Sequence, residues 1–379
     1  MNNLQTQPNG SPPGPVVPLD KVEALRLSVS HLFTTFDTAL DQPHPGYVRF
    51  RGHFLQDPAH CFDELRSQFE RHGFTPMIRR EKERTLLIAL PVVFRDQPSN
   101  PWVNLLLLIA TIFSTLLIGA TYDAPLGEGL QNLWRGWPFS LSIMLILGAH
   151  ELGHYFAARY HKVPVTLPYF IPLPFPQVSL FGTLGAFIRL KAPVKNRRAL
   201  FDVGAAGPLA GLVFAVPILL YGLFTSELGQ IGPGPVLLEG NSLLYALAKL
   251  AIFGQLLPNG TTDVFLNQVA WAGWVGLLVT GLNLLPVGQL DGGHVAYVLF
   301  GKRARQLFWP ILLALGALVI FTGTLTWAIW IVLLFFVGRY HAEPLDDVTP
   351  LDRPRKIVAV ATLILFFFVF VPIPIQIIQ

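Results

Sequence analysis

The sequence predicts a polytopic α-helical membrane protein, with about seven spans and a re-entrant β-hairpin, and a small cytosolic α/β domain at its N-terminus. Of the 379 residues, 52% are hydrophobic and 13% are charged, about half the charged fraction of an ordinary soluble domain. Long apolar runs begin after Asn100, whereas the preceding residues have the composition of a soluble domain. These observations exclude a wholly soluble protein and make the lipid bilayer the first expected partner.

The charge balance and the cysteine count limit the possible functions further. A net charge of +4, from 27 basic and 23 acidic residues, is too small to indicate a nucleic-acid partner. The single cysteine, Cys61, excludes a disulfide framework and a metal site built from thiolates.

The first hundred residues divide into a tail and a domain. Residues 1–19 are rich in Pro, Gly and Asn and lack the basic and apolar regions of a signal peptide, which predicts a disordered tail. Residues 20–97 are expected to fold as the soluble α/β domain. Its predicted elements are a helix over 20–40, a strand over 47–54, a helix from Pro58 to Gly73 with Asp57 as its N-cap, and a hairpin whose strands flank the charged turn 81–84.

Seven apolar segments follow. The length of each is compared with about 20 residues, the length of helix that crosses the hydrocarbon of a bilayer. The run 307–338 fits either one tilted helix or two short helices broken at 322–324. Basic residues flank this run on both sides, and the positive-inside rule places both flanks in the cytosol, so two helices are expected. The predicted spans are 102–121, 138–160, 200–224, 264–286, 307–322, 325–338 and 356–374.

The distribution of basic residues predicts the topology. With the N-terminal domain in the cytosol, the outer loops hold only two of the 27 basic residues, Arg135 and Lys249. We expect a multi-pass protein of a prokaryotic inner membrane, with a plastid membrane as the alternative. Residues 98–340 would form the core, and residues 341–379 a linker and a last transmembrane helix. The chain has no internal repeat, which weakens a transporter interpretation.

The second predicted span contains the sequence His150-Glu151-Leu152-Gly153-His154. The i, i+4 spacing puts both imidazoles on one helical face, where they can share one Zn²⁺, and Glu151 lies beside them as a general base. The alternative is two core histidines and a structural glutamate. Three ionisable residues inside a span each cost about 2.5–3.5 kcal/mol and by default mark function, so the metal site is favoured.

A catalytic zinc needs a third protein ligand, and the end of the fourth span offers one. Asn283 and Pro286 precede Asp291 in the sequence NLLPVGQLDGG, where the helix is expected to unwind. Asp291 would complete a set of two histidines and one carboxylate that holds one Zn²⁺ per chain. His294 is a rival ligand, and Asp291 is alternatively the N-cap of the next helix.

The two motifs together resemble the paired signature of the site-2 protease family of intramembrane zinc metalloproteases, peptidase family M50. This resemblance implies that His150, His154 and Asp291 bind zinc, that Glu151 is the general base, and that Asn283 positions the substrate or its oxyanion. It covers roughly residues 100–340. Within this family, the chain looks most like the branch named for ethylene-dependent gravitropism-deficient yellow-green plants. The features that resemble this branch are the sequence NLLPVGQLDGG, the segment 50–52 and the missing PDZ module.

Residues 163–190 are apolar yet hold five prolines between Pro164 and Pro176, so they cannot form an ordinary span. The part 177–190 has the composition of strands and resembles the re-entrant β-hairpin of site-2 proteases. Its edge would pair with an unwound substrate, with Gly182, Thr183 and, from the second motif, Pro286 as substrate-binding residues. The alternative is a Pro-rich cytosolic loop.

Two further segments have simpler interpretations. Gly207 and Gly211 in the third span favour close helix packing. Asp202 is expected either to cap that helix or to pair with Arg197 or Arg198. The segment 241–254, which contains Lys249, is amphipathic and expected on the outer surface.

The pattern as a whole predicts a zinc-dependent intramembrane endopeptidase, a hydrolase that cleaves transmembrane protein substrates in or near their transmembrane segments. The alternative is a non-proteolytic metal-binding membrane protein or a transporter, and a second alternative is a membrane protease with soluble substrates. Glu151 discriminates between the first two, because a transporter needs the metal ligands but no base beside them.

Overall fold

The structure is a computed structural model that describes residues 17–82, 84–122, 131–177, 179–232, 234, 236–323, 326–339 and 343–378. Most of the predicted tail, residues 1–16, lies outside the described residues. The chain forms two compact units. One runs to Arg95 and takes in Lys195–Arg197 and Pro344–Pro350, and the other holds the remainder.

The first unit is a four-stranded antiparallel sheet with the strand order β1-β2-β4-β3 and two helices. The helix predicted to begin at Pro58 is α2, and the Asp57 side chain accepts a hydrogen bond of 2.9 Å from the Ala59 amide as its N-cap. Gly73 follows the helix with a φ of 85°. The elements are α1 (Leu19–Ser28), β1 (Phe33–Leu40), β2 (Val48–Phe54), α2 (Pro58–Arg71), β3 (Thr75–Glu81) and β4 (Arg84–Leu90).

The prediction of one helix over 20–40 was wrong in its second half. The helix ends at Ser28, and Phe33–Leu40 forms strand β1, paired with β2. A bulge between Thr35 and Asp37 shifts the register of this pairing. Because a bulge adds one residue and moves the alternation to the other face, the apolar residues of β1 do not follow the two-residue period that marks a strand.

Two short segments from much later in the chain complete the first unit. The amide of Ile78 donates to the carbonyl of Leu345 at 2.8 Å, and the amide of Asp346 donates to the carbonyl of Lys195 at 2.8 Å. Leu345 is buried in the core of this unit. The domain is therefore not built from a single continuous stretch of chain.

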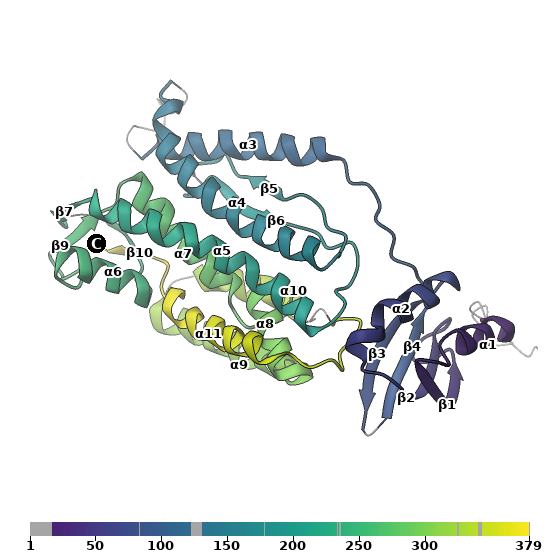
Figure 1. The fold of residues 1–379 in the computed structure, drawn as a ribbon. Helices are drawn as coiled ribbons and strands as arrows, with labels where there is room; N and C mark the ends of the chain where they lie inside the picture. Colours follow the sequence, from purple (N-terminus) through teal and green to yellow (C-terminus); the bar gives the residue numbers. More distant parts are fainter. Residues whose placement is uncertain are drawn as a thin grey trace, which may run out of the picture. The chain divides into compact units, whose positions relative to one another are not determined.

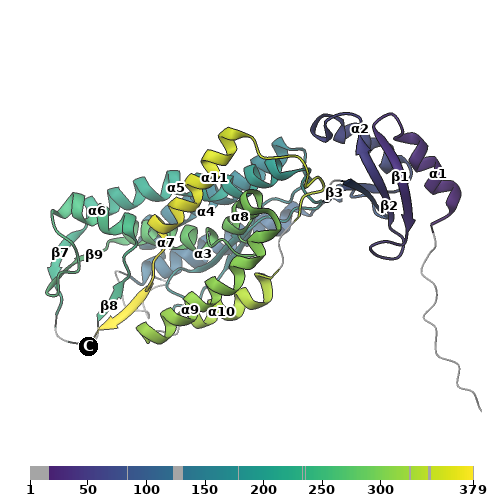
Figure 2. The ribbon, with the colours of Figure 1, turned by 90° about the horizontal axis from the view of Figure 1, so that it is seen from below.

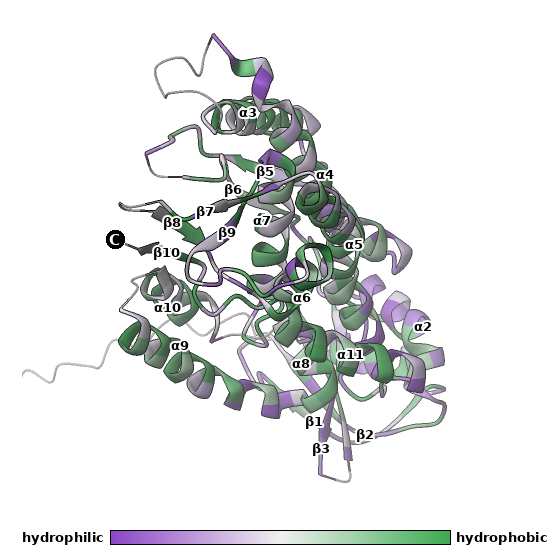
Figure 3. Ribbon diagram, turned by 90° about the vertical axis from the view of Figure 1, so that its left-hand side faces the viewer, coloured by the Kyte–Doolittle hydropathy of each residue, from purple (hydrophilic) through white to green (hydrophobic). Residues whose placement is uncertain are grey.

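The second unit is mostly helical, and seven of its helices coincide with the predicted apolar segments. Helix α4 lies between α3 and α7, and α9 and α10 lie side by side (Figures 1 and 2). Figure 3 shows that hydrophobic residues dominate these helices. The helices are α3 (Pro101–Ala120), α4 (Trp137–Tyr160), α5 (Arg197–Phe224), α6 (Leu243–Phe253), α7 (Gln268–Asn283), α8 (Asp291–Phe300), α9 (Phe308–Thr322), α10 (Thr326–Val337) and α11 (Arg353–Val369).

Local signals in the sequence explain several helix boundaries. Asn100 caps α3 by accepting from the Trp102 amide, and Asn267 caps α7 by accepting from two amides. Gly323 ends α9 in the left-handed conformation, with a φ of 67°, so the run 307–338 is broken into two helices near the predicted place. Thr324 and Leu325 lie outside the described residues.

Three described segments are long and apolar enough to cross a membrane. They are Pro101–Ala120, Arg197–Phe224 and Asp291–Thr322, and the last of these takes in α8, a short 3-10 helix and α9. Their mean hydropathies are 2.3, 2.1 and 1.8. These segments support a membrane location.

Three two-stranded antiparallel sheets complete the second unit. The Pro-rich segment forms the hairpin of β5 (Tyr169–Pro172) and β6 (Thr183–Phe187), so part of the proline-containing stretch is itself a strand. β7 (Glu227–Gln230) pairs with β9 (Thr262–Phe265), and β8 (Val236–Glu239) pairs with β10 (Ile375–Ile378) near the end of the chain.

The structure shows the partners of two charged residues, and for the second of them it corrects a prediction. Lys249 is fully buried on α6, with its Nζ atom 2.9 Å from Glu239 Oε1 and 3.2 Å from Asp263 Oδ1. The amphipathic segment thus directs a charge inward, where two carboxylates compensate it. Asp202 lies inside α5 and binds Arg355 at 2.7 Å and His161 at 2.8 Å, so it is not a helix cap.

Candidate metal centre

Helix α4 brings His150 and His154 together. One helical turn separates the two residues, so their side chains project from the same face, and their Nε2 atoms lie 3.2 Å apart. Both residues are less than 10% exposed. The Nδ1 atom of His154 donates to the carbonyl of Val203 at 2.6 Å, which leaves Nε2 as its ligand atom and fixes the plane of the ring.

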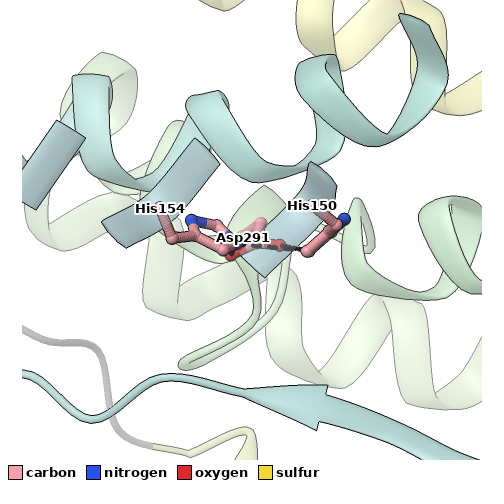
Figure 4. A group of neighbouring side chains, drawn as sticks. All are labelled: His150, His154 and Asp291. Carbon is pink, nitrogen blue, oxygen red and sulfur yellow. Dashed lines mark hydrogen bonds and ion pairs between the residues drawn. The ribbon is translucent and has the colours of Figure 1, made fainter. Parts of the chain in front are cut away.

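Asp291 reaches the two histidines from the other motif. After Asn283 the chain leaves helix α7 and stays irregular until α8 begins at Asp291. The carboxylate of Asp291 lies 3.3 Å from the Nε2 atom of His150 and 3.3 Å from that of His154 (Figure 4). The alternative role of Asp291 as an N-cap is wrong, because Leu290 occupies that position.

The three donor groups fit a zinc ion. Two histidine nitrogens and a carboxylate oxygen are its preferred ligands, and bonds of about 2.0–2.1 Å at tetrahedral angles place the donors about 3.3 Å apart. The two nitrogens are 3.2 Å apart, and each lies 3.3 Å from a different oxygen of the Asp291 carboxylate, His150 from Oδ2 and His154 from Oδ1. Three protein ligands leave one position of a tetrahedron open, which is the arrangement of a catalytic site.

The rival ligand His294 stands apart from this group. Among the described residues, only His150, His154 and Asp291 form a group with ligand atoms within 4.8 Å of one another. His294 lies one turn into α8 and lines a cavity beside the group. The structure thus brings together the preferred ligand set from the sequence.

Glycines of helix α5 make room for the two imidazoles. A Cβ atom on Gly207 would lie 2.1 Å from Nε2 of His154, and a Cβ atom on Gly211 would lie 3.3 Å from His150. The spacing of four residues between these glycines matches the spacing between the histidines they face. The sequence predicts only helix packing for these glycines, and the shared spacing is the signal that indicates their second role.

Glu151 and Asn283 lie beside the ligands. Glu151 follows His150 on α4 and is 6% exposed. The Nδ2 atom of Asn283 is 3.3 Å from Nε2 of His150. A carboxylate and an amide donor therefore line the same cavity as the three ligands. These are the groups that proton transfer and stabilisation of an oxyanion require.

Two cavities meet at the candidate centre, and both are lined by His150, Glu151, Ala186 and Asn283. We call the cavity of about 290 Å³ the apolar cavity and that of about 230 Å³ the polar cavity. Strand β6 passes along both. Thr183, Leu184 and Gly185 line the apolar cavity, and Phe187 and Ile188 line the polar cavity.

The predicted substrate-binding residues separate into two groups. Thr183 lines the apolar cavity. Gly182 lines neither cavity, has a φ of 71° and accepts a hydrogen bond of 2.5 Å from Ser114 Oγ. Pro286 lies in the irregular segment between α7 and α8 and also lines neither cavity. Trp330, Pro374 and Ile375 line the apolar cavity, and no motif in the sequence pointed to them.

Residues 138–323 match the family described as Peptidase family M50. Among similar proteins, the chain is 29% identical over 354 residues to the Arabidopsis thaliana protein "Probable zinc metalloprotease EGY2, chloroplastic", with 89% of this chain covered. It is 34% identical over 237 residues to "Probable zinc metalloprotease EGY1, chloroplastic" of the same plant, with 60% covered. An EGY3 protein of Oryza sativa subsp. indica is 29% identical, with 68% covered.

The matched regions are only part of these relatives. They cover 62% of the EGY2 protein, 41% of the EGY1 protein and 46% of the EGY3 protein. No solved structure gave a significant match to the chain. The predicted resemblance to this family and to this branch is confirmed by these similarities.

Proposed function

We propose that the chain, whose residues 138–323 match peptidase family M50, is a zinc-dependent endopeptidase that hydrolyses peptide bonds in or near transmembrane segments of membrane proteins. The observation that carries the proposal is the close approach of His150, His154 and Asp291, whose ligand atoms lie within 4.8 Å of one another, with Glu151 beside them. Similar proteins named as zinc metalloproteases support zinc as the cofactor.

We assign a chemical role to each residue of the site. Bound zinc would act as a Lewis acid toward the scissile carbonyl and toward water. The Glu151 carboxylate accepts the proton of the attacking water and passes it to the leaving amine. The Asn283 amide donates to the carbonyl oxygen as that oxygen gains negative charge. A metal-binding protein without peptidase activity would need the three ligands but neither of these two groups.

The proposed topology has seven spans, a cytosolic N-terminal domain and a re-entrant hairpin. It is supported by helices at all seven predicted apolar segments and by the scarcity of basic residues in the proposed outer loops. The presence of strands β5 and β6 among membrane helices supports the re-entrant hairpin, since non-helical backbone at membrane depth has to lie within protein. A prokaryotic inner membrane is the proposed location, with the plastid membrane as the alternative.

The substrate is proposed to lie as an extended strand along β6. This strand follows both cavities past the candidate centre, and pairing with its edge would hold a peptide at the ligands while its carbonyl groups stay accessible. Gly182 then contributes by shaping the start of β6, and Pro286 by ending α7 before the segment that carries Asp291. Both act through position rather than by lining a cavity.

The first test is the identity of the third ligand. We expect Asp291→Ala to reduce zinc to well below one ion per chain, because two histidines alone leave the site incomplete. His294→Ala, from the same turn of α8, serves as the matched control and should keep its zinc. The measurement is metal content of the purified protein by mass spectrometry. Zinc retained in Asp291→Ala but lost in His294→Ala would make His294 the third ligand.

The second test concerns strand β6. We expect Leu184→Pro to slow cleavage at least about tenfold without changing zinc content, because proline removes a backbone donor and disrupts pairing. Leu184 is suitable because its side chain is 68% exposed, whereas the Thr183 hydroxyl donates to Ile171 and accepts from Gly185.

Leu184→Val is the control for this test, since it keeps strand geometry and should cleave at a rate close to wild type. Rates would be measured on a single-span peptide in lipid vesicles. Equal rates for Leu184→Pro and Leu184→Val would mean that β6 does not present the substrate.

A further inference from the structure

We infer that the apolar cavity is a subsite for one bulky apolar side chain of the substrate, and that the C-terminal segment of the chain forms its far wall. The inference rests on the proposed peptidase function and adds a substrate preference to it. At about 290 Å³, the cavity is at the lower limit of ligand pockets, which span about 300–1,000 Å³. This size suits a single side chain next to the scissile bond.

The residues that line the apolar cavity favour an apolar substrate side chain over a polar one. Helix α7 presents one face to it through Val275, Leu278, Val279 and Leu282, a spacing of i, i+3, i+4 and i+7. Apart from the groups at the candidate centre, two lining residues carry a polar side-chain atom. They are Thr183, whose hydroxyl is already bonded within the hairpin, and Trp330, whose indole has one N–H donor. A charged or amide side chain placed there would lose its hydrogen bonds to water and could replace few of them.

The far wall consists of Trp330 from α10 and of Pro374 and Ile375 from the C-terminal segment. Three attachments hold this segment in place. Trp327 Nε1 donates to the Pro372 carbonyl at 2.6 Å, and the Gly240 amide donates to the Pro374 carbonyl at 2.8 Å. Ile375 itself pairs with Glu239 in the sheet of β10 and β8. The wall is therefore a fixed boundary of the subsite.

The polar cavity on the other side of the centre differs in its lining. Besides the residues of the candidate centre and apolar residues such as Ile188 and Leu190, it is lined by His294 and Gln289. A substrate that follows β6 therefore meets an apolar enclosure on the Thr183 side of the scissile bond and polar groups on the other side. The preference for a bulky apolar residue should consequently apply to one position only.

The test uses a series of single-span peptides in lipid vesicles, with Phe, Leu, Ala, Gln or Asp placed in turn at each residue that flanks the cleavage site. The wild type should cleave the Phe and Leu peptides at least tenfold faster than the Gln and Asp peptides, at one flanking position. Val279→Phe fills the cavity and should slow the Phe peptide at least tenfold more than it slows the Ala peptide. Val213→Phe, the same change at a site that is 68% exposed on α5, should behave as wild type.

The far wall is tested separately. Ile375→Ala lengthens the cavity and should move the preference toward a peptide with Trp at that position, whereas the neighbouring exposed Gln376→Ala should not. Glu151-dependent cleavage with no preference at any position, or an equal loss of rate on all peptides in Val279→Phe, would overturn the inference while the peptidase function stands. If wild type and Glu151→Gln give identical results on every peptide, both proposals fail.

Discussion

Glu151→Gln is expected to abolish peptide cleavage while one zinc ion per chain stays bound. Glutamine keeps the size of the side chain but cannot accept the proton of the attacking water, and general-base catalysis contributes about 10²–10⁴-fold to a rate. Glu151 is not one of the three grouped metal ligands, so the zinc content should not change. Both quantities can be measured on one preparation, by product analysis and by metal content.

The control is Glu227→Gln, the same chemical change at an exposed position of β7. It should cleave like wild type. Cleavage by Glu151→Gln within about threefold of wild type would rule out the general-base role. Loss of zinc together with activity would instead make Glu151 part of the metal site.

Gly207→Ala is expected to remove zinc and activity together, although the change adds only a methyl group. The new Cβ atom would lie 2.1 Å from Nε2 of His154, the ligand atom itself. The ring cannot simply rotate away, because its Nδ1 atom is bonded to the Val203 carbonyl. Zinc affinity should fall about 100-fold or more, since changes in groups that only orient metal ligands already cost about 10–100-fold.

Gly148→Ala is the matched control for this prediction. Gly148 lies in helix α4, which carries both histidines, and nothing lies within 4 Å of a Cβ atom there. Zinc binding in this variant should equal that of wild type. Normal zinc content in Gly207→Ala would mean that the two helices can move apart without cost to the site.

The helical segments could be predicted because each depends on local information. Asn100, Asn267 and Gly323 end or begin helices through their own side-chain and backbone properties. Strand β1 could not be predicted, because its pairing with β2 and its bulge are set by distant residues. The contribution of Leu345 and Asp346 to the first unit could not be predicted either, because it also depends on contacts between residues far apart in the sequence.

The candidate centre was predictable to the extent that its residues follow regular spacing. His150 and His154 meet because a helix turns every 3.6 residues, and Asp291 was found through its motif. The residues that surround the centre were harder to predict from the sequence. Gly207 and Gly211 have an obvious packing role that concealed their second one, and Ile375 reaches the apolar cavity from 84 positions beyond Asp291.

The buried pairing of Lys249 with Glu239 and Asp263 has a consequence for how the protein responds to a transmembrane potential. In the proposed topology these three residues lie on the outer side as a group with one net negative charge, and Arg135 remains there as the exposed basic residue. Moving a unit charge through the potential involves about 2.3 kcal/mol per 100 mV. A potential that is negative inside therefore favours the proposed orientation, because an inverted chain would carry the basic cytosolic segments outward against the field.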